Sequence, residues 1–281
     1  MKQLAFKQVD VFTRTPFRGN PVAVVLDGRG LATEEMQHIA SWTNLSETTF
    51  VLPPGAQEAD YRVRIFAPRY ELPFAGHPTI GTAHAVLEAG IVKPKAGRFR
   101  QECGAGVLDL TVEDGLIWVK APPHKTLGFD NTRRAELEAA LGTKVLGEPF
   151  TVNVGPSWLV AEVADAEELA RMPLSLDKIA RLSEALKITG ITAFGKSADE
   201  RSAVHVRSFA PAQAIPEDPV CGSGNISVAA YLAGTGRAKA PYSARQGMQL
   251  GRDGLVSLRV ESGTIFLGGH AVTCVEGSLR V

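Results

Sequence analysis

Alternation of apolar and polar positions predicts many short strands along this chain. The clearest case is 60–66, where Tyr61, Val63 and Ile65 fall on one face and arginines on the other, as expected for a half-buried strand. Apolar residues spaced by three or four predict a helix with Thr33 as its N-cap and an end near Thr43 and Asn44. The strands predicted in the first half are 4–12, 21–26, 48–52, 60–66, 97–103, 106–112 and 115–120.

A polar, proline-containing stretch at 121–130 predicts a linker, and a helix over 132–141 follows it. After this helix the order of elements in the first half recurs, and 247–281 again predicts short strands with glycine-rich turns. The other elements predicted in the second half are strands 150–154, 158–163, 190–195 and 202–209 and helices 165–171 and 175–187. Many short strands with an internal helix in each half favour an α+β fold, in which a curved sheet wraps around a helix.

Two stretches that each combine a strand, a turn and a helix repeat at an offset of 143 residues. The first begins at Phe66 and the second at Phe209, and they align without a gap. The identical pairs are Phe66/Phe209, Ala67/Ala210, Pro68/Pro211, Pro73/Pro216 and Gly81/Gly224. Because half the chain separates the copies, we expect a duplicated domain whose halves each contribute one turn and helix to a shared cleft.

Charge and composition exclude several classes of partner. The 281 residues carry 30 basic and 30 acidic side chains without a long run of like charge, so neither nucleic acid nor an anionic membrane is an expected partner. No apolar run approaches the roughly 20 residues of a membrane span. Lys7 and Asp10 interrupt the apolar region that a signal peptide would need, so we expect a soluble, cytoplasmic protein.

Three widely spaced cysteines favour reduced thiols over a disulfide framework.

A glycine-rich turn that opens a helix presents unpaired N–H groups and the positive end of the helix dipole to a carboxylate or phosphate. Gly222, Ser223 and Gly224 supply such a turn in the second stretch, and Asp218 is close enough in sequence to line the same pocket. In the alternative interpretation Asp218 only begins a turn and Ser223 only caps the helix. The first stretch has a corresponding glycine turn, which contains His77. Two such turns favour the interpretation as a binding site over the interpretation as a turn and a helix cap.

His77 follows Gly76 in the first stretch, and an ordinary side-chain pKa of about 6.5 suits it to acid/base chemistry or hydrogen-bond donation. Its alternative role is that of a core or capping histidine.

Glu47 lies among hydroxyl residues between an apolar helix end and an apolar strand. A carboxylate in a partly desolvated place has a raised pKa and can take up and return a proton, whereas a lone glutamate is more often a surface charge. The six histidines lack metal-binding spacing, so no metal is expected.

Cys221 suggests a competing mechanism. A two-base racemase needs a thiol at the start of each of two related helices. In the gapless alignment Cys221 stands opposite Pro78, so the second thiol is missing. The turns match neither the P-loop, nor the dinucleotide-binding glycine pattern, nor the GxSxG elbow, which removes the usual support for nucleotide-binding and serine-hydrolase functions.

Four stretches, spread from the N-terminal part to the second repeat, resemble the PhzF-like phenazine biosynthesis family. They are Asp10-Val-Phe-Thr with Gly19-Asn-Pro-Val-Ala-Val24, Asn44-Leu-Ser-Glu-Thr-Thr-Phe50, Phe66-Ala-Pro with Glu71 to Ala83, and Glu217-Asp-Pro-Val-Cys-Gly-Ser-Gly224. The resemblance implies a diaminopimelate-epimerase-like fold: two similar domains, each a barrel-like sheet around a central helix, with the site between them. We place the domains at 1–120, completed by a strand from 270–281, and at 121–269.

Carried over residue by residue, the resemblance makes Glu47 the acid/base that shuttles a proton. His77 and Asp218 become polar partners that orient the substrate and assist the transfer. Gly222 and Ser223 anchor a substrate carboxylate.

Gly76 and Gly224 complete the implied binding residues, and the resemblance further implies a homodimer that uses no cofactor. The reaction of the namesake enzyme is the isomerisation of trans-2,3-dihydro-3-hydroxyanthranilate, in which a proton moves between ring carbons. This chain has Cys-Gly-Ser-Gly-Asn at 221–225, where the phenazine enzymes more usually have Thr-Gly-Ser-Ala, so the substrate stays open.

Three hypotheses follow. The first is a cofactor-independent isomerase of a small carboxylated metabolite, with Glu47 essential. The second is a one-thiol racemase or epimerase that uses Cys221. The third is a homologue without catalytic activity that binds a small molecule or a protein.

Overall fold

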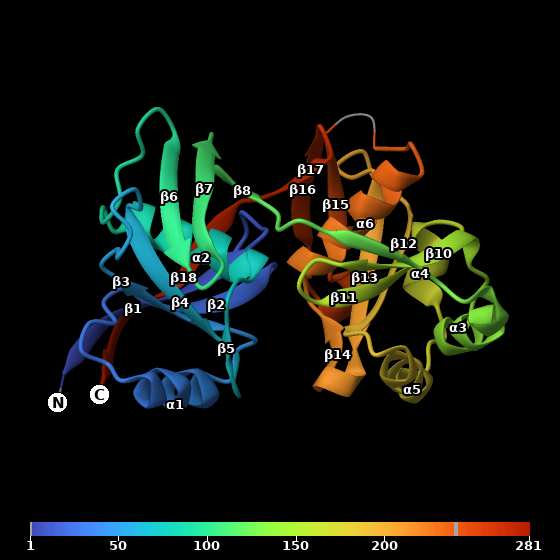
Figure 1. Cartoon of the computed structure of the whole chain (residues 1–281), viewed down its shortest axis with the longest axis horizontal. Coiled ribbons are helices and arrows are strands. Elements are labelled where there is room, and N and C mark those ends of the chain that lie inside the picture. Colours follow the sequence, from blue (N-terminus) through green and yellow to red (C-terminus); the bar gives the residue numbers. More distant parts are fainter. Residues whose placement is uncertain (1, 239–240) are drawn as a thin grey trace. The chain divides into compact units, whose positions relative to one another are not determined.

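The computed structural model describes residues 2–238 and 241–281 (Figure 1). Contacts within the chain divide it into two compact units, which we call unit 1 (Met1–Lys120 with Gly268–Val281) and unit 2 (Ala121–Leu267). Each unit combines a mixed sheet with helices, so the predicted α+β class is confirmed. Among the residues described, no helix is both long and apolar enough to cross a membrane.

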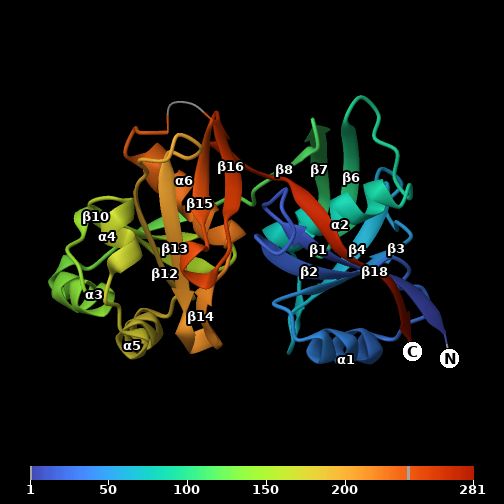
Figure 2. The ribbon, with the colours of Figure 1, turned by 180° about the vertical axis from the view of Figure 1, so that it is seen from behind.

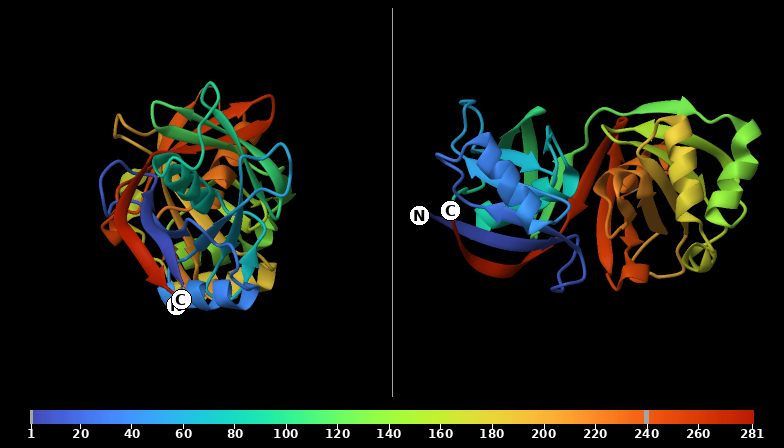
Figure 3. Two further views of the ribbon diagram at one scale, coloured as in Figure 1. Left: turned by 90° about the vertical axis from the view of Figure 1, so that its left-hand side faces the viewer. Right: turned by 90° about the horizontal axis from the view of Figure 1, so that it is seen from below.

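In unit 1 the strands lie in the spatial order β18, β1, β2, β3, β4, β6, β7, β8, and the short β5 pairs with β4. Pairs β2–β3 and β4–β6 are parallel, and the other neighbours are antiparallel. The strand bounds are β1 Gln3–Val11, β2 Asn20–Val25, β3 Thr48–Leu52, β4 Tyr61–Phe66, β5 Glu71–Leu72, β6 Arg98–Cys103, β7 Gly106–Glu113, β8 Leu116–Lys120 and β18 Ala271–Arg280. Because β18 pairs with β1, both ends of the chain belong to unit 1 (Figures 2 and 3).

The helix α2 (Gly76–Glu88) is enclosed by the sheet of unit 1 because it is apolar on nearly every side. It contacts β1, β2, β3, β8 and β18, and every residue from 77 to 83 is buried. Its buried hydroxyls are paired: Thr82 donates to the hydroxyl of Thr49 at 2.8 Å. A second helix, α1 (Thr33–Thr43), packs on β3 and β4 through Met36 and Ala40.

Unit 2 repeats the strand order and directions of unit 1. Its strands lie in the order β9, β10, β11, β12, β13, β15, β16, with β14 paired to β13 and with parallel pairs β11–β12 and β13–β15. Their bounds are β9 Lys125–Gly128, β10 Leu146–Asn153, β11 Ser157–Glu162, β12 Gly190–Lys196, β13 Val204–Ala210, β14 Ile215–Asp218, β15 Tyr242–Gln246, β16 Gly254–Glu261 and β17 Thr264–Gly269, which ends in unit 1.

The helix α6 (Gly222–Gly234) takes in unit 2 the place that α2 takes in unit 1. It is buried from Gly224 to Leu232 and contacts β10, β11, β12 and β16. Three further helices, α3 (Arg134–Leu141), α4 (Ala166–Arg171) and α5 (Leu176–Leu186), form a second core with β11 to β13.

The internal repeat is real, but its gapless alignment fails before the helices. β4 and β13 keep the offset of 143, whereas α2 and α6 begin at Gly76 and Gly222, which are 146 apart. The three additional residues lie between β13 and α6, where Pro211–Gln213 forms a 3-10 turn (η2). The corrected alignment places Ser223 opposite His77 and Cys221 opposite Ala75, so the second thiol remains missing.

The predicted linker at 121–130 contains the short strand β9, which pairs with β10. Sequence analysis missed this strand because all four of its residues are exposed, so no apolar face marks it. The helix predicted at 132–141 begins as a 3-10 turn (η1, Asn131–Arg133) and continues as α3.

Gly190, at the start of β12, tests the packing of unit 2. A Cβ at this position would collide with the backbone carbonyl of Phe209 on β13, whereas a Cβ at Gly128 meets nothing within 4 Å. We expect Gly190→Ala to lower the free energy of unfolding by about 1–3 kcal/mol and the control Gly128→Ala to change it by less than about 0.5 kcal/mol. Urea unfolding of both variants measures this, and equal stabilities would contradict the packing.

Candidate active site

Glu47 lies in the short junction between α1 and β3. The cap residue of α1, Asn44, adopts the left-handed conformation with a φ of 54°, and β3 begins at Thr48. The backbone carbonyl of Glu47 accepts a hydrogen bond from the N–H of Ala23 on β2 at 3.4 Å. This contact ties the junction to the sheet that encloses α2.

The side chains of Glu47 and His77 lie next to each other in unit 1. Glu47 Oε2 is 3.4 Å from His77 Nε2, and the two side chains are only 16% and 8% exposed. His77 is the second residue of α2, after Gly76, so the buried start of the helix places its ring beside the carboxyl group.

Burial raises the pKa of the Glu47 carboxyl to about 7, although a hydrogen bond with Ser46 opposes part of the shift. A carboxyl group whose pKa lies near neutral pH is populated in both protonation states, as an acid that takes up and returns a proton requires. The sequence-based expectation of a desolvated carboxyl group at this position therefore agrees with the structure.

Asp218 ends β14 in unit 2 and shapes the turn that leads into α6. Its Oδ1 accepts a hydrogen bond from the N–H of Val220 at 3.0 Å, and its backbone carbonyl accepts one from Gln246 Nε2 at 3.0 Å. Gln246 Oε1 in turn accepts from the N–H of Cys221 at 3.2 Å. Asp218 thus has the turn-forming role that the alternative interpretation gave it.

The first turn of α6 leaves two N–H groups for a ligand. The N–H of Gly224 donates to Cys221 Sγ at 3.3 Å, and the N–H of Asn225 donates to the carbonyl of Cys221 at 3.0 Å. The N–H groups of Gly222 and Ser223 have no hydrogen-bond partner among the described residues. Unpaired N–H groups at a helix start are the groups that bind anions in proteins, so these two are the candidates for an anion site.

Gly224 contributes space in place of a hydrogen-bond donor. A Cβ at this position would come within 2.9 Å of Thr192 Oγ1 and would collide with the hydroxyl of Ser208. The predicted set of Gly222, Ser223 and Gly224 therefore divides into two residues with available N–H groups and one that must lack a side chain.

The cysteine of this turn is a helix cap. Cys221 is 4% exposed, and burial raises the pKa of its thiol well above the ordinary value. A thiol that stays protonated and accepts a hydrogen bond from Gly224 is a poor base. The structure thus disfavours the one-thiol mechanism.

Sequence analysis missed an arginine–glutamate clamp that occurs in both units. Arg207 donates from Nε and Nη2 to Glu217 at 2.9 and 2.8 Å, and so holds β14 against β13. Arg64 binds Glu71 in the same way at 2.7 and 2.6 Å. Each guanidinium group also lies 5.0 Å from the ring of the phenylalanine two residues later in its strand. The glutamates are 146 residues apart, so a gapped alignment of the repeat could have found the clamp.

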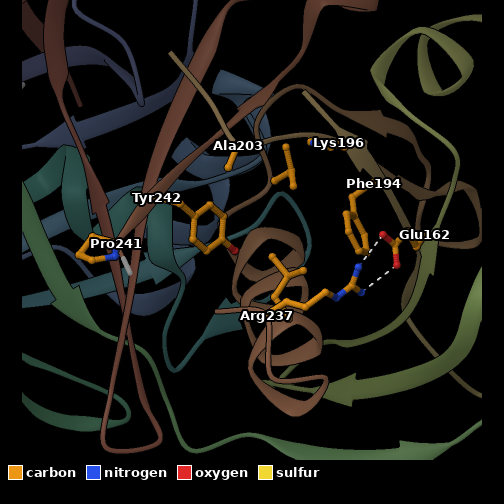
Figure 4. A pocket seen from close by; sticks show the side chains of 9 residues that line it. Glu162, Phe194, Lys196, Ala203, Arg237, Pro241 and Tyr242 are labelled. Atoms are coloured by element: carbon orange, nitrogen blue, oxygen red, sulfur yellow. Dashed lines mark hydrogen bonds and ion pairs between the residues drawn. The ribbon is translucent and has the colours of Figure 1, made fainter. Parts of the chain in front are cut away.

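A separate cavity of about 460 Å³ lies in unit 2 near the C-terminal end of α6 (Figure 4). It is lined by apolar side chains such as Phe194 and Leu232, and the ion pair between Arg237 and Glu162, with a 2.7 Å contact, lies in its wall. None of the predicted site residues lines it. Within the described ranges, no group of three His, Cys, Asp or Glu side chains could hold a metal ion.

The chain is similar to known proteins over nearly its full length. A family model described as "Phenazine biosynthesis-like protein" (PhzC-PhzF) matches residues 9–277. The chain is 40% identical over 294 residues to "Antisense-enhancing sequence 1" of Schizosaccharomyces pombe, with 99% of each chain covered.

It is also 33% identical over 281 residues to trans-2,3-dihydro-3-hydroxyanthranilate isomerase of Pseudomonas aeruginosa, with 96% of this chain and 93% of that one covered. Among solved structures, the PhzF-family phenazine biosynthesis protein of Bacillus anthracis matches with a TM-score of 0.88 and 28% identity, and 100% of each chain is covered.

The raised pKa of Glu47 predicts a pH-dependent stability. Because the folded pKa of about 7 exceeds the ordinary value of 4.5, the protonated group favours the folded state. This contribution is complete below pH 4.5 and is lost as the pH rises through 7. Between these limits, wild type should lose at most about 3 kcal/mol of unfolding free energy relative to Glu47→Gln. Urea unfolding at several pH values measures the difference, and parallel pH curves would contradict the buried carboxyl group.

Burial of Cys221 predicts an unreactive thiol. Iodoacetamide at pH 7 should leave Cys221 unmodified in the native protein and modify it in urea, because thiolate formation is suppressed at this site. Mass spectrometry of the peptides measures this, with the partly exposed Cys274 as the internal comparison. Modification of Cys221 at the rate of Cys274 would revive the thiol hypothesis.

Proposed function

Because the chain belongs to the phenazine biosynthesis-like PhzC-PhzF family, we propose that it moves a proton between two carbons of a small carboxylated substrate without a cofactor. Relatives in this family are named as isomerases. The chain is itself an isomerase and has the diaminopimelate-epimerase-like fold. The observation that carries the proposal is the buried carboxyl group of Glu47, with a pKa of about 7, beside His77.

In the proposed reaction Glu47 in its carboxylate form takes a proton from one carbon of the substrate. The electron pair of the broken C–H bond is delocalised into the adjacent unsaturated system, and the carboxyl group then returns the proton to another carbon of that system. No net proton is gained or lost. His77 stands 3.4 Å from the carboxyl group and supports this role by hydrogen bonding to the substrate or to Glu47.

We assign Gly222 and Ser223 to the binding of a substrate carboxylate, because their available N–H groups lie at the positive end of α6. Asp218 orients the substrate from the end of β14, and the resemblance adds Gly76 and Gly224, in the first turns of α2 and α6, to the proposed binding residues. The proposed substrate is trans-2,3-dihydro-3-hydroxyanthranilate or a similar carboxylated metabolite. Support comes from the name of the relative that is 33% identical.

We also propose that the protein is a cytoplasmic homodimer that binds neither nucleic acid nor membranes. The balanced charge of 30 basic and 30 acidic residues and the family resemblance support this proposal. Sedimentation velocity measures the oligomeric state.

Glu47→Gln tests the proposed chemistry. The amide cannot take up a proton, so turnover of trans-2,3-dihydro-3-hydroxyanthranilate should fall by about 10²–10⁴-fold. The matched control is Glu58→Gln, an exposed glutamate, which should keep full turnover. Product formed in deuterium oxide should carry solvent deuterium at the carbon that gains the proton. Full turnover by Glu47→Gln, together with a product free of deuterium, would rule out this role.

A further inference from the structure

Trp158 is joined to the predicted substrate-binding serine by a hydrogen bond. It lies on β11, is 4% exposed, and donates from its indole Nε1 to Ser223 Oγ at 2.9 Å. Sequence analysis did not select Trp158, because a buried tryptophan in a strand is ordinarily a packing residue. Its polar atom, however, makes this bond to the first turn of α6.

The bond restricts how the Ser223 hydroxyl can act. A serine hydroxyl has one hydrogen to donate and two lone pairs that accept, whereas the indole N–H can only donate. Trp158 therefore occupies an acceptor position of Ser223. The hydroxyl hydrogen must then point to another acceptor.

Cys221 is the only other side chain in hydrogen-bond contact with this hydroxyl among the described residues. Its Sγ lies 3.5 Å from Ser223 Oγ and already accepts the N–H of Gly224 at 3.3 Å. Sulfur is a weak acceptor, whereas hydrogen bonds to a carboxylate are about twice as strong as neutral ones. A carboxylate at the N–H groups of Gly222 and Ser223 would therefore attract the hydroxyl hydrogen as a third donor.

We propose that Trp158 is a positioning residue that holds the Ser223 hydroxyl as a donor to the carboxylate of the substrate. The inference rests on the function proposed above. It adds that the site favours a carboxylate, because Trp158 occupies one of the two lone pairs of the hydroxyl, and the hydroxyl hydrogen is directed to an acceptor other than the indole.

The indole of Trp158 is buried where its strand meets α6. Trp158 is 4% exposed, and β11 contacts α6. Within the sheet Trp158 pairs in register with Gly190 of the parallel strand β12. Burial on this strand places the indole Nε1–H at the start of α6.

The test measures the affinity for anthranilate by calorimetry. This stable aromatic carboxylate is the probe for the wild type, Trp158→Phe, Ser223→Ala and the double variant. We expect Trp158→Phe to weaken binding about fivefold and Ser223→Ala about tenfold, because each removes or misdirects one hydrogen bond to the carboxylate. In the Ser223→Ala background, Trp158→Phe should have no further effect. The control is Trp42→Phe, at a tryptophan that is 79% exposed on α1.

A second measurement keeps the test valid if Trp158→Phe folds poorly. In the ¹⁵N spectrum of the wild type, anthranilate should shift the indole N–H resonance of Trp158, and Ser223→Ala should abolish this shift. Equal affinities of wild type and Trp158→Phe, or the same loss in both backgrounds, would overturn the role of Trp158 and leave the proposed function intact. Failure of wild type to bind either anthranilate or acetate would instead remove the carboxylate substrate and, with it, this inference.

Discussion

The enclosure of an apolar helix by a sheet, in each unit, is the constraint on which the candidate site depends. A helix with no polar face gains stability only if every side is buried, and burial extends to its first turn. The N–H groups of that turn cannot bond within the helix, so each needs another acceptor. In α6, Cys221 supplies the acceptors for Gly224 and Asn225. The N–H groups of Gly222 and Ser223 have no such acceptor among the described residues.

The same burial accounts for the raised pKa of Glu47 in unit 1. The start of α2 is packed inside its sheet, and Glu47 on the adjacent junction is desolvated there. Moving a carboxylate out of water disfavours the charged form, which raises the pKa toward neutrality. The protein therefore gives up some folding stability above pH 7 and gains a group that exchanges protons at that pH.

The two units share a scaffold and differ in their chemistry. Both clamp a short return strand with a bidentate arginine–glutamate pair, and both begin the enclosed helix with a glycine. At the next position unit 1 has His77, which faces a carboxyl group, and unit 2 has Ser223, which receives a hydrogen bond from Trp158. The duplication thus repeats the backbone but not the side chains: one equivalent position holds an imidazole beside a carboxyl group in unit 1 and a hydroxyl bonded to an indole in unit 2.

The sequence by itself predicted most strands and helices, the duplication and the residues proposed for the site. Alternation, helical spacing and glycine turns depend on neighbours within a few residues, so they can be recognised without a fold. Tertiary structure alone decided the rest. The exposed strand β9 is set by its pairing with β10, and the three-residue shift before α6 is absorbed by a turn with no periodicity. The pKa of Glu47, the capping role of Cys221 and the bond from Trp158 to Ser223 depend on burial and on contacts between residues far apart in the chain.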